Sequence, residues 1–330
     1  MLFIHRYSDA VHTDLKVDAN QFLISFPGSK ALFEGIMGFI QVNATVVIAT
    51  DTINDCLRRI NLQTGQTAAF AGTCRGSGYL DGKLLNDARF NDPYGIVSFK
   101  DDYYITDSRN NAIRVIEEQR DWVSTIISGS RHLVDPLAIT FNPFSTNYVA
   151  LVTTFSKGLY SVNMKTNSVT QLTNRVGETG TLSASKLPDP RSMTFISDSV
   201  VVIAVPNLGQ LAIIDLTRND ISYICDGTRA TRNGDIRSCQ LKNPFSVMEI
   251  KDSLYIAQLE GIRRLPLTAL AEFIQPPTTT TSSTPTTIKY GNYGKIDWGP
   301  TRMIYVSIGG GDCQSRRLKE TWTLDKNGGP

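Results

Sequence analysis

One phrase recurs along the chain, and this internal repeat constrains the fold more than any other sequence feature. The segment VVIATDTINDCLRRI at 46–60 superimposes on YYITDSRNNAIRVI at 103–116, and GIRRLPL at 261–267 repeats the end of the phrase. A second phrase precedes each copy and is centred on a proline. Its copies carry Pro93, Pro136, Pro190 and Pro244, and a degenerate first copy has Gly35 in the proline position.

Each copy has the pattern of short strands. An apolar stretch follows the proline, and then come a polar turn and a β-branched run such as VVVIAV at 200–205. A third strand follows a loop, and a fourth strand such as TAAFAG at 67–72 closes the unit. Repeated four-stranded antiparallel units of this length are typical of β-propeller blades. We therefore expect an all-β propeller, with a short helix only at 267–275.

The number of blades is left open by the repeats alone. Five copies are visible, and NQFLISFPG at 20–28 resembles the fourth strand of the other units. That segment is expected to complete the last blade by joining the two chain ends, so five and six blades are both compatible with the sequence.

Composition changes after Gln275. The tract PPTTTTSSTPTT at 276–287 has no apolar residue, which is typical of a flexible linker or an O-glycosylated stalk, and we favour the stalk. We expect a propeller over 1–275, a Thr/Ser/Pro-rich linker over 276–287 and a short C-terminal segment of unknown fold over 288–330.

The segment FAGTCRGSGYLDGKLLNDARFNDPYGI at 70–96 resembles the signature of NHL-repeat β-propellers. In that family Ala-Gly ends one blade, an Asp-Gly loop follows, and Ala-Arg-Phe-x-x-Pro-x-Gly-Ile begins the next. TDTINDCLRRI resembles the family's Asp-x-x-Asn-His-x-Ile-Arg segment, although Asp55 and Asn111 replace its histidine. Known NHL propellers mostly have six blades, so the resemblance favours six over five.

Several residues of these phrases have a structural interpretation. Asp51 and Asp107 are expected to accept backbone hydrogen bonds in the loop that follows each strand. Gly72, Gly82 and Gly95 suit turn positions with positive φ. The four prolines lack an N–H and are therefore expected at strand entrances.

The five cysteines indicate the redox state of the compartment in which the protein folds. Cys56 and Cys74 flank a predicted hairpin, and Cys225 and Cys239 close a loop of similar size, so two local disulfides are expected. Buried free thiols are the alternative; zinc ligation is less favoured because no CxxC or histidine pair accompanies them. Two bridges indicate an oxidising compartment. Cys313 is expected to be free or to pair outside this chain.

A glycosylation sequon, with the cysteine pairs and the Thr/Ser tract, favours an extracellular or secreted protein, or an ectodomain. Asn43-Ala44-Thr45 is an N-glycosylation sequon in a predicted turn. His5, Arg6 and Asp9 interrupt the N-terminal apolar residues, so a signal peptide is not expected in this sequence. No apolar run is long enough to span a bilayer as a helix.

The net charge and the histidine content bear on which classes of function are favoured. The chain has 33 Lys and Arg against 31 Asp and Glu, a formal charge of +2, which gives no support to nucleic-acid binding. RNA binding, known for some NHL propellers, is kept as an alternative. A second alternative is an enzyme of the amidating-lyase or lactonase type with a metal in the central channel. Only His5, His12 and His132 are present, so we expect no enzyme, cofactor or metal, although an all-carboxylate calcium site stays open.

The favoured function is a non-enzymatic platform that binds a protein or an acidic glycan. Loops that enter each blade and loops between the second and third strands should share one rim of the ring. Ordinary solvated loops are the alternative interpretation of their charge. The candidate binding residues on these loops are Arg75, Tyr79, Arg109, Lys157, Arg229, Arg232 and Arg237.

Overall fold

The computed structural model describes residues 33–128, 133–155, 158–173, 187–258 and 261–274. Three two-residue strands outside these ranges are described by their backbone alone: β1 (Gln21–Phe22), β15 (Gly180–Thr181) and β23 (Met303–Ile304). Within the described part of the chain, no helix has the length and apolar character needed to cross a membrane.

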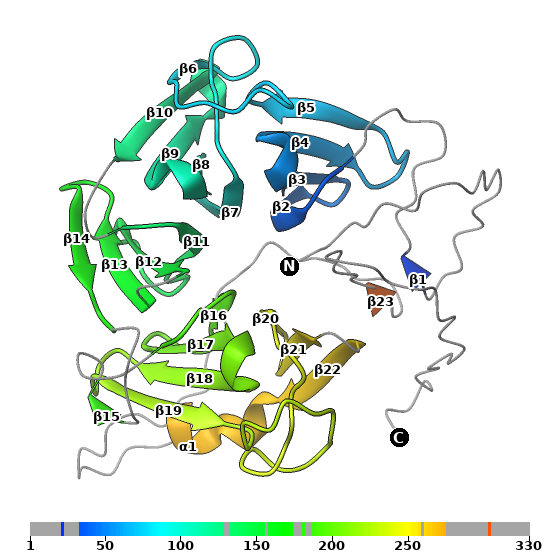
Figure 1. The fold of residues 1–330 in the computed structure, drawn as a ribbon, viewed down its shortest axis with the longest axis vertical. Coiled ribbons are helices and arrows are strands. Elements are labelled where there is room, and N and C mark those ends of the chain that lie inside the picture. Colours follow the sequence, from blue (N-terminus) through cyan, green and yellow to red (C-terminus); the bar gives the residue numbers. More distant parts are fainter. Residues whose placement is uncertain are drawn as a thin grey trace.

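Five antiparallel blades stand around a common centre, with the first strand of each blade innermost (Figure 1). Blade 1 contains β2 (Ile36–Asn43), β3 (Val46–Asp51), β4 (Cys56–Asn61) and β5 (Thr67–Ala71). Blade 2 contains β7 (Pro93–Phe99), β8 (Asp102–Asp107), β9 (Ala112–Glu117) and β10 (Trp122–Ile127), with β6 (Gly82–Lys83) added to its outer edge. Blade 3 contains β11 (Pro136–Phe141), β12 (Val149–Thr154), β13 (Gly158–Asn163) and β14 (Ser168–Gln171).

Blades 4 and 5 complete the series. Blade 4 contains β16 (Met193–Phe195), β17 (Val200–Val205), β18 (Gln210–Asp215) and β19 (Asp220–Ile224), with β15 paired to the outer edge of β19. Blade 5 contains β20 (Ser246–Ile250), β21 (Ser253–Gln258) and β22 (Gly261–Pro266). A 3-10 turn (Leu267–Leu270) and the short helix α1 (Ala271–Ile274) follow β22, at the place where the sequence predicts a helix.

The predicted β-propeller is confirmed, but the preference for six blades is wrong, because the described residues form five. Among the described strands, the segment at 20–28, predicted to form the fourth strand of the last blade, does not pair with β22. Gln21–Phe22 pairs in parallel with Met303–Ile304 instead. The linker at 276–287 lies outside the described residues, as does the segment at 288–330 except for β23.

Hydrophobic clusters fill the spaces between neighbouring blades. Ile48 and Leu57 of blade 1, for example, pack with Phe90, Ile105 and Ile116, which belong to blade 2 and its entrance. Three further clusters join blades 2 and 3, blades 3 and 4, and blades 4 and 5 in the same way. A blade is therefore stable only against its neighbours, because each sheet has two apolar faces to bury.

Threonine hydroxyls connect neighbouring blades close to the centre of the ring. The hydroxyl stands one residue before the end of the second strand and donates to a carbonyl on the first strand of the next blade or just before it. The pairs are Thr50 with Tyr94 (2.8 Å), Thr106 with Leu137 (2.5 Å) and Thr153 with Arg191 (3.1 Å). Blade 4 has Ala204 at this position, and the Ser192 hydroxyl donates to the Val247 carbonyl at 3.2 Å instead.

Two inner-strand glycines lie where blades approach most closely. A Cβ on Gly95 would lie 2.4 Å from the Leu137 carbonyl oxygen, and a Cβ on Gly38 would lie 2.6 Å from that of Tyr94. The prediction of a positive φ is confirmed for Gly72 (+81°) and Gly82 (+146°) but is wrong for Gly95. Gly95 is required by the approach of the next blade and not by a turn.

The prolines lie at blade entrances as predicted. Pro93 and Pro136 begin β7 and β11, and Pro190 and Pro244 lie three and two residues before β16 and β20. The residue before each proline is left-handed, with φ between 47° and 53°, a conformation that Asp and Asn tolerate: Asp92, Asp135, Asp189 and Asn243. Gly35 (φ +73°) has this position in blade 1, so Ile36, and not Gly35, replaces the proline.

Candidate functional site

The entrance loops and the loops between the second and third strands meet on one side of the ring, which we call the entrance rim. Asp55 ends the turn after β3 and accepts the Asp92 backbone N–H at 2.9 Å. Asn111 ends the turn after β8 and accepts the Asp135 backbone N–H at 2.8 Å. Both residues are left-handed, so Asp and Asn combine an unusual backbone conformation with a useful acceptor. The two loop families therefore lie together, and binding by this rim stays a prediction.

The buried carboxylate of Asp107, beneath the entrance rim, stabilises the fold through hydrogen bonds and an ion pair. Asp107 accepts the Asn91 backbone N–H at 2.7 Å, the Asn110 amide at 2.9 Å and the Arg114 guanidinium at 2.7 Å. Burial raises the pKa of Asp107, while the hydrogen bonds from Asn110 and Asn91 and the charge of Arg114 oppose that effect. Asp107 is thus a structural carboxylate that ties a blade entrance to the strand beside it.

The same arrangement is present in two other blades. Asp51 accepts the Glu34 N–H at 2.7 Å, and Gln258 accepts the Lys242 N–H at 3.2 Å. The prediction that Asp51 and Asp107 accept backbone hydrogen bonds from the loop that follows them is therefore wrong. Their backbone donors belong to the blade entrance upstream, and the following turn contributes the side-chain amides of Asn54 and Asn110.

The two longest described entrance loops, residues 72–92 and 225–243, are built alike. The Gly72 N–H donates to Leu84 and the Cys225 N–H donates to Ile236, each at 2.7 Å. Each loop also closes through one isolated β-bridge, Leu80 with Arg89 and Arg232 with Gln240. The two loops are equivalent parts of the repeat.

An arginine on the third strand secures each of these loops; Arg114 is buried and Arg263 is half-buried. Arg114 donates to the carbonyls of Leu80 (2.6 Å) and Arg89 (2.9 Å). Arg263 is the corresponding residue of blade 5. It donates to the carbonyls of Arg232 (2.9 Å) and Gln240 (2.7 Å).

Both predicted disulfides are confirmed. Cys56–Cys74 joins the start of β4 to the first long loop, and Cys225–Cys239 closes the base of the second. Cys56 and Cys225 are buried, so the bridges anchor the loops to the core.

The predicted binding residues form two separate groups on the rim. Arg75, Tyr79 and Arg109 lie at the junction of blades 1 and 2. Arg109 pairs with Asp92, and this hydrogen bond, together with the charges of Asp92, Asp135 and Asp55, raises its pKa. Arg75 donates to the Asn54 side chain at 3.4 Å, and the Tyr79 ring lies 5.3 Å from the Arg114 guanidinium carbon.

Arg229, Arg232 and Arg237 form the second group, at the junction of blades 4 and 5. Arg229 donates to the Asn207 carbonyl at 2.5 Å, and the side chains of Arg232 and Arg237 are exposed. Lys157 lies outside the described residues. The structure therefore does not gather the seven predicted residues into one cluster.

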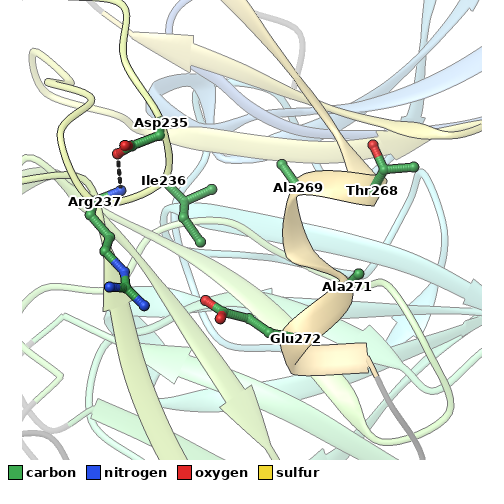
Figure 2. Close-up of a pocket in the computed structure, with 7 residues that line it drawn as sticks. All are labelled: Asp235, Ile236, Arg237, Thr268, Ala269, Ala271 and Glu272. Carbon is green, nitrogen blue, oxygen red and sulfur yellow. Dashed lines mark hydrogen bonds between the residues drawn. The ribbon is translucent and has the colours of Figure 1, made fainter.

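A groove runs beside the second long loop, on the outer side of blade 4. A cavity of about 350 Å³ lies between Asp235–Arg237 and Thr268–Glu272, and Figure 2 shows Ile236 and Glu272 facing each other across it. A cavity of about 500 Å³ shares Ile236, Arg237 and Glu272 and follows β19. Hydrogen bonds from the Ser238 side chain and from the Ser238 and Arg237 backbone lower the pKa of Asp235. The groove therefore carries both charges around a partly apolar floor.

The residues that follow the blade entrances have equivalent positions at or just before the innermost strands, and we call this set the axial collar. Its members correspond because Ile36 pairs with Asp51 as Pro93 pairs with Asp107. Sequence analysis did not single out this set, although the position after the recurring proline could have identified most of it. The axial collar consists of Met37, Tyr94, Leu137, Arg191 and Phe245.

Over the described ranges, no three His, Cys, Asp or Glu side chains come together in a way that could hold a metal ion. His5, His12 and His132 lie outside these ranges.

Comparisons with known proteins support the fold. No family model and no curated protein matches the chain. Among solved structures, a protein of unknown function from Bacteroides thetaiotaomicron matches with a TM-score of 0.56, 17% identity and coverage of 73% of this chain and 57% of that one. A nidogen/laminin complex matches with a TM-score of 0.51, 16% identity and coverage of 71% and 76%. A catalytically inactive virginiamycin B lyase from Staphylococcus aureus, with quinupristin, has a TM-score of 0.47, 14% identity and coverage of 70% and 66%.

At these identities the likeness to the first two structures shows the β-propeller fold alone. The chain spans little more than half of the Bacteroides protein.

Proposed function

We propose that this protein is an extracellular propeller of the NHL type that binds a protein or an acidic glycan through its entrance rim and catalyses no reaction. The observation that carries the proposal is the construction of the two long loops. Each loop is joined to the core by a disulfide and by an arginine that donates hydrogen bonds to carbonyls on both sides of the loop. Such loops present side chains in a fixed geometry, which lowers the entropic cost of binding a partner.

The exposed side chains of the rim fit this role. Ile53, Tyr79 and Leu80 are 61%, 44% and 57% exposed, and all three lie on turns or loops of the entrance rim. Exposed apolar and aromatic side chains on a rigid base are typical of recognition surfaces. Nearby arginines add donors for acidic groups.

Two further features support the extracellular setting. The two disulfides are typical of proteins that fold in an oxidising compartment. Asn43, the first residue of the sequon, is exposed at the end of β2, next to the turn that leads into β3. This turn lies at the opposite end of the strands from the entrance rim. A glycan there would leave the rim free. The nidogen/laminin structure adds a propeller from a protein complex, which is compatible with protein recognition.

Heparin-affinity chromatography tests the rim with a defined acidic glycan. The wild-type protein should be retained, and Arg229→Ala with Arg232→Ala should elute at lower salt because two exposed rim cations are lost. Lys100→Ala with Lys165→Ala is the matched control, because it removes the same charge from turns at the opposite ends of the strands and should elute nearer to wild type. Equal elution of the rim variant and the wild type would contradict binding by these loops.

A further inference from the structure

Arg191 is the charged member of the axial collar. The other four members are apolar or aromatic. The Arg191 guanidinium lies over the Phe155 ring at 5.0 Å, and its Nη1 donates to the Tyr94 hydroxyl at 3.4 Å. These contacts hold one cation of blade 4 between the Phe155 loop of blade 3 and the first strand of blade 2.

The two groups that contact this cation, the Phe155 ring and the Tyr94 hydroxyl, are neutral, unlike the partners of several other arginines of the repeat. Arg58, Arg109, Arg114 and Arg218 each form an ion pair with an aspartate. Among the described residues no carboxylate pairs with Arg191. Asp189, two residues away, accepts a hydrogen bond from the Asn207 amide instead.

A half-buried guanidinium with neutral neighbours is well suited to an external anion. Removing a cation from water is costly unless an opposite charge or hydrogen-bond acceptors replace the lost solvation. Tyr94 accepts from only one N–H of Arg191, and further donors remain for the forked geometry that an oxyanion prefers. The Phe155 ring fixes the orientation of the guanidinium plane.

The guanidinium and the ring beside it are accessible to a ligand from solvent. Phe155 is 45% exposed, and the Arg191 side chain is partly exposed beside it. An anionic group bound to the guanidinium would bring its apolar neighbours against Phe155 and the aromatic members of the collar. The arrangement therefore favours an oxyanion carried on a ligand with an apolar or sugar face.

We propose that Arg191, Tyr94 and Phe155 form a binding site for one oxyanion, a carboxylate or a sulfate, presented by the ligand at the centre of the entrance rim. This inference rests on the proposed function and specifies the chemistry of its ligand. Arg191 binds the anion, Tyr94 positions the guanidinium, and the Phe155 ring packs against the guanidinium.

Titration of the protein with two oligosaccharides tests the site and distinguishes the anions. A hyaluronan tetrasaccharide offers carboxylates only, and a carboxyl-reduced heparin tetrasaccharide offers sulfates only. The Nε–Hε resonance of Arg191, assigned by its loss in Arg191→Met, should shift and saturate with at least one of them. Calorimetry should show binding weakened about tenfold or more in Arg191→Met, as expected for loss of a charge-assisted pair.

Controls separate the loss of the site from a general loss of positive charge. Arg120→Met removes an exposed arginine from the turn between β9 and β10, at the end of the strands opposite the entrance rim, and should bind both probes as wild type does. Tyr94→Phe keeps the ring and should weaken binding less than Arg191→Met. Unchanged thermal unfolding of Arg191→Met would confirm that its fold is intact, and if that variant is unstable, Arg191→Lys takes its place, with a smaller expected loss.

Wild-type affinity in Arg191→Met, or no response of the Arg191 resonance to either probe, would overturn the proposed site. Retention on heparin that still depends on Arg229 and Arg232 would then leave the proposed function standing. Loss of both effects would remove the function as well.

Discussion

Arg114 shows how a charge can be part of the folding core and not of a binding surface. Its side chain and that of Asp107 are both fully buried, and it also reaches Asp81 and two loop carbonyls. Residue type alone cannot distinguish such an arginine from an exposed one such as Arg109. The difference lies in position, because Arg109 lies within the turn Ser108–Asn110 and Arg114 lies on β9, from where it reaches the carbonyls of the first long loop.

Replacement of this buried cation should therefore be severe. Arg114→Met leaves Asp107 buried without its ionic partner and should lower the free energy of unfolding by about 3 to 5 kcal/mol. Arg120→Met is the control, since Arg120 is exposed and pairs with Glu117 three residues away, and should cost less than about 1 kcal/mol. Urea unfolding followed by tryptophan fluorescence measures both. Similar losses in the two variants would contradict the structural role of Arg114.

Buried tyrosines predict an alkaline limit to stability. Burial, followed by the hydrogen bond to Glu118 and its charge, raises the pKa of Tyr103 to about 12, and burial raises those of Tyr104 and Tyr223 to about 12. In the unfolded chain these groups ionise near pH 10. The unfolded state therefore loses protons first, and stability should fall as the pH rises from about 10 towards 12.

Unfolding free energies measured at pH values on either side of 10 test this slope. Tyr223→Phe should reduce the slope, because it removes one of the three groups. A stability that stays level through this range would show that the tyrosines are accessible to solvent.

At the scale of elements, the strands and the prolines at their entrances were predictable, and the side-chain directions at the entrances were not. Alternating apolar residues and turn residues define the strands, and the predicted hairpin brings Cys56 and Cys74 together. The axial collar was missed because the pairing register shifts between Pro93 and Ile96, so the period of two is broken at Tyr94. No alternation then indicates which side chain faces the centre.

The second long loop should depend on its disulfide. Cys225→Ser with Cys239→Ser opens a closed loop and should lower the free energy of unfolding by about 3 kcal/mol. Hydrogen exchange should increase mainly over 226–240, because only hydrogen bonds, such as those from Arg263 and Arg229, then hold the loop. Cys313→Ser, which removes a cysteine outside both bridges, is the control. Unchanged exchange over this loop would show that these hydrogen bonds are sufficient.

At the scale of the whole molecule, blade number is the property that the sequence could not decide. The visible copies number five, as in the structure, but the N-terminal strand was assigned to the last blade by likeness alone. Pairing between distant segments leaves no local signal, and Gln21–Phe22 pairs with Met303–Ile304. The clusters between blades depend on size and burial, which many apolar residues satisfy equally, so they do not encode a count.

The two rims of the ring should differ in function. Asn43 accepts hydrogen bonds from the Thr45 N–H (2.9 Å) and hydroxyl (3.1 Å), and it is exposed on the side opposite the entrance rim. Protein secreted from eukaryotic cells should lose mass on treatment with an N-glycosidase, and Asn43→Gln and Thr45→Ala should each abolish that change. Heparin retention should stay the same after deglycosylation, because the glycan and the binding loops lie at opposite ends of the strands. A large change in retention would place the glycan on the binding face and require the rim to be reassigned.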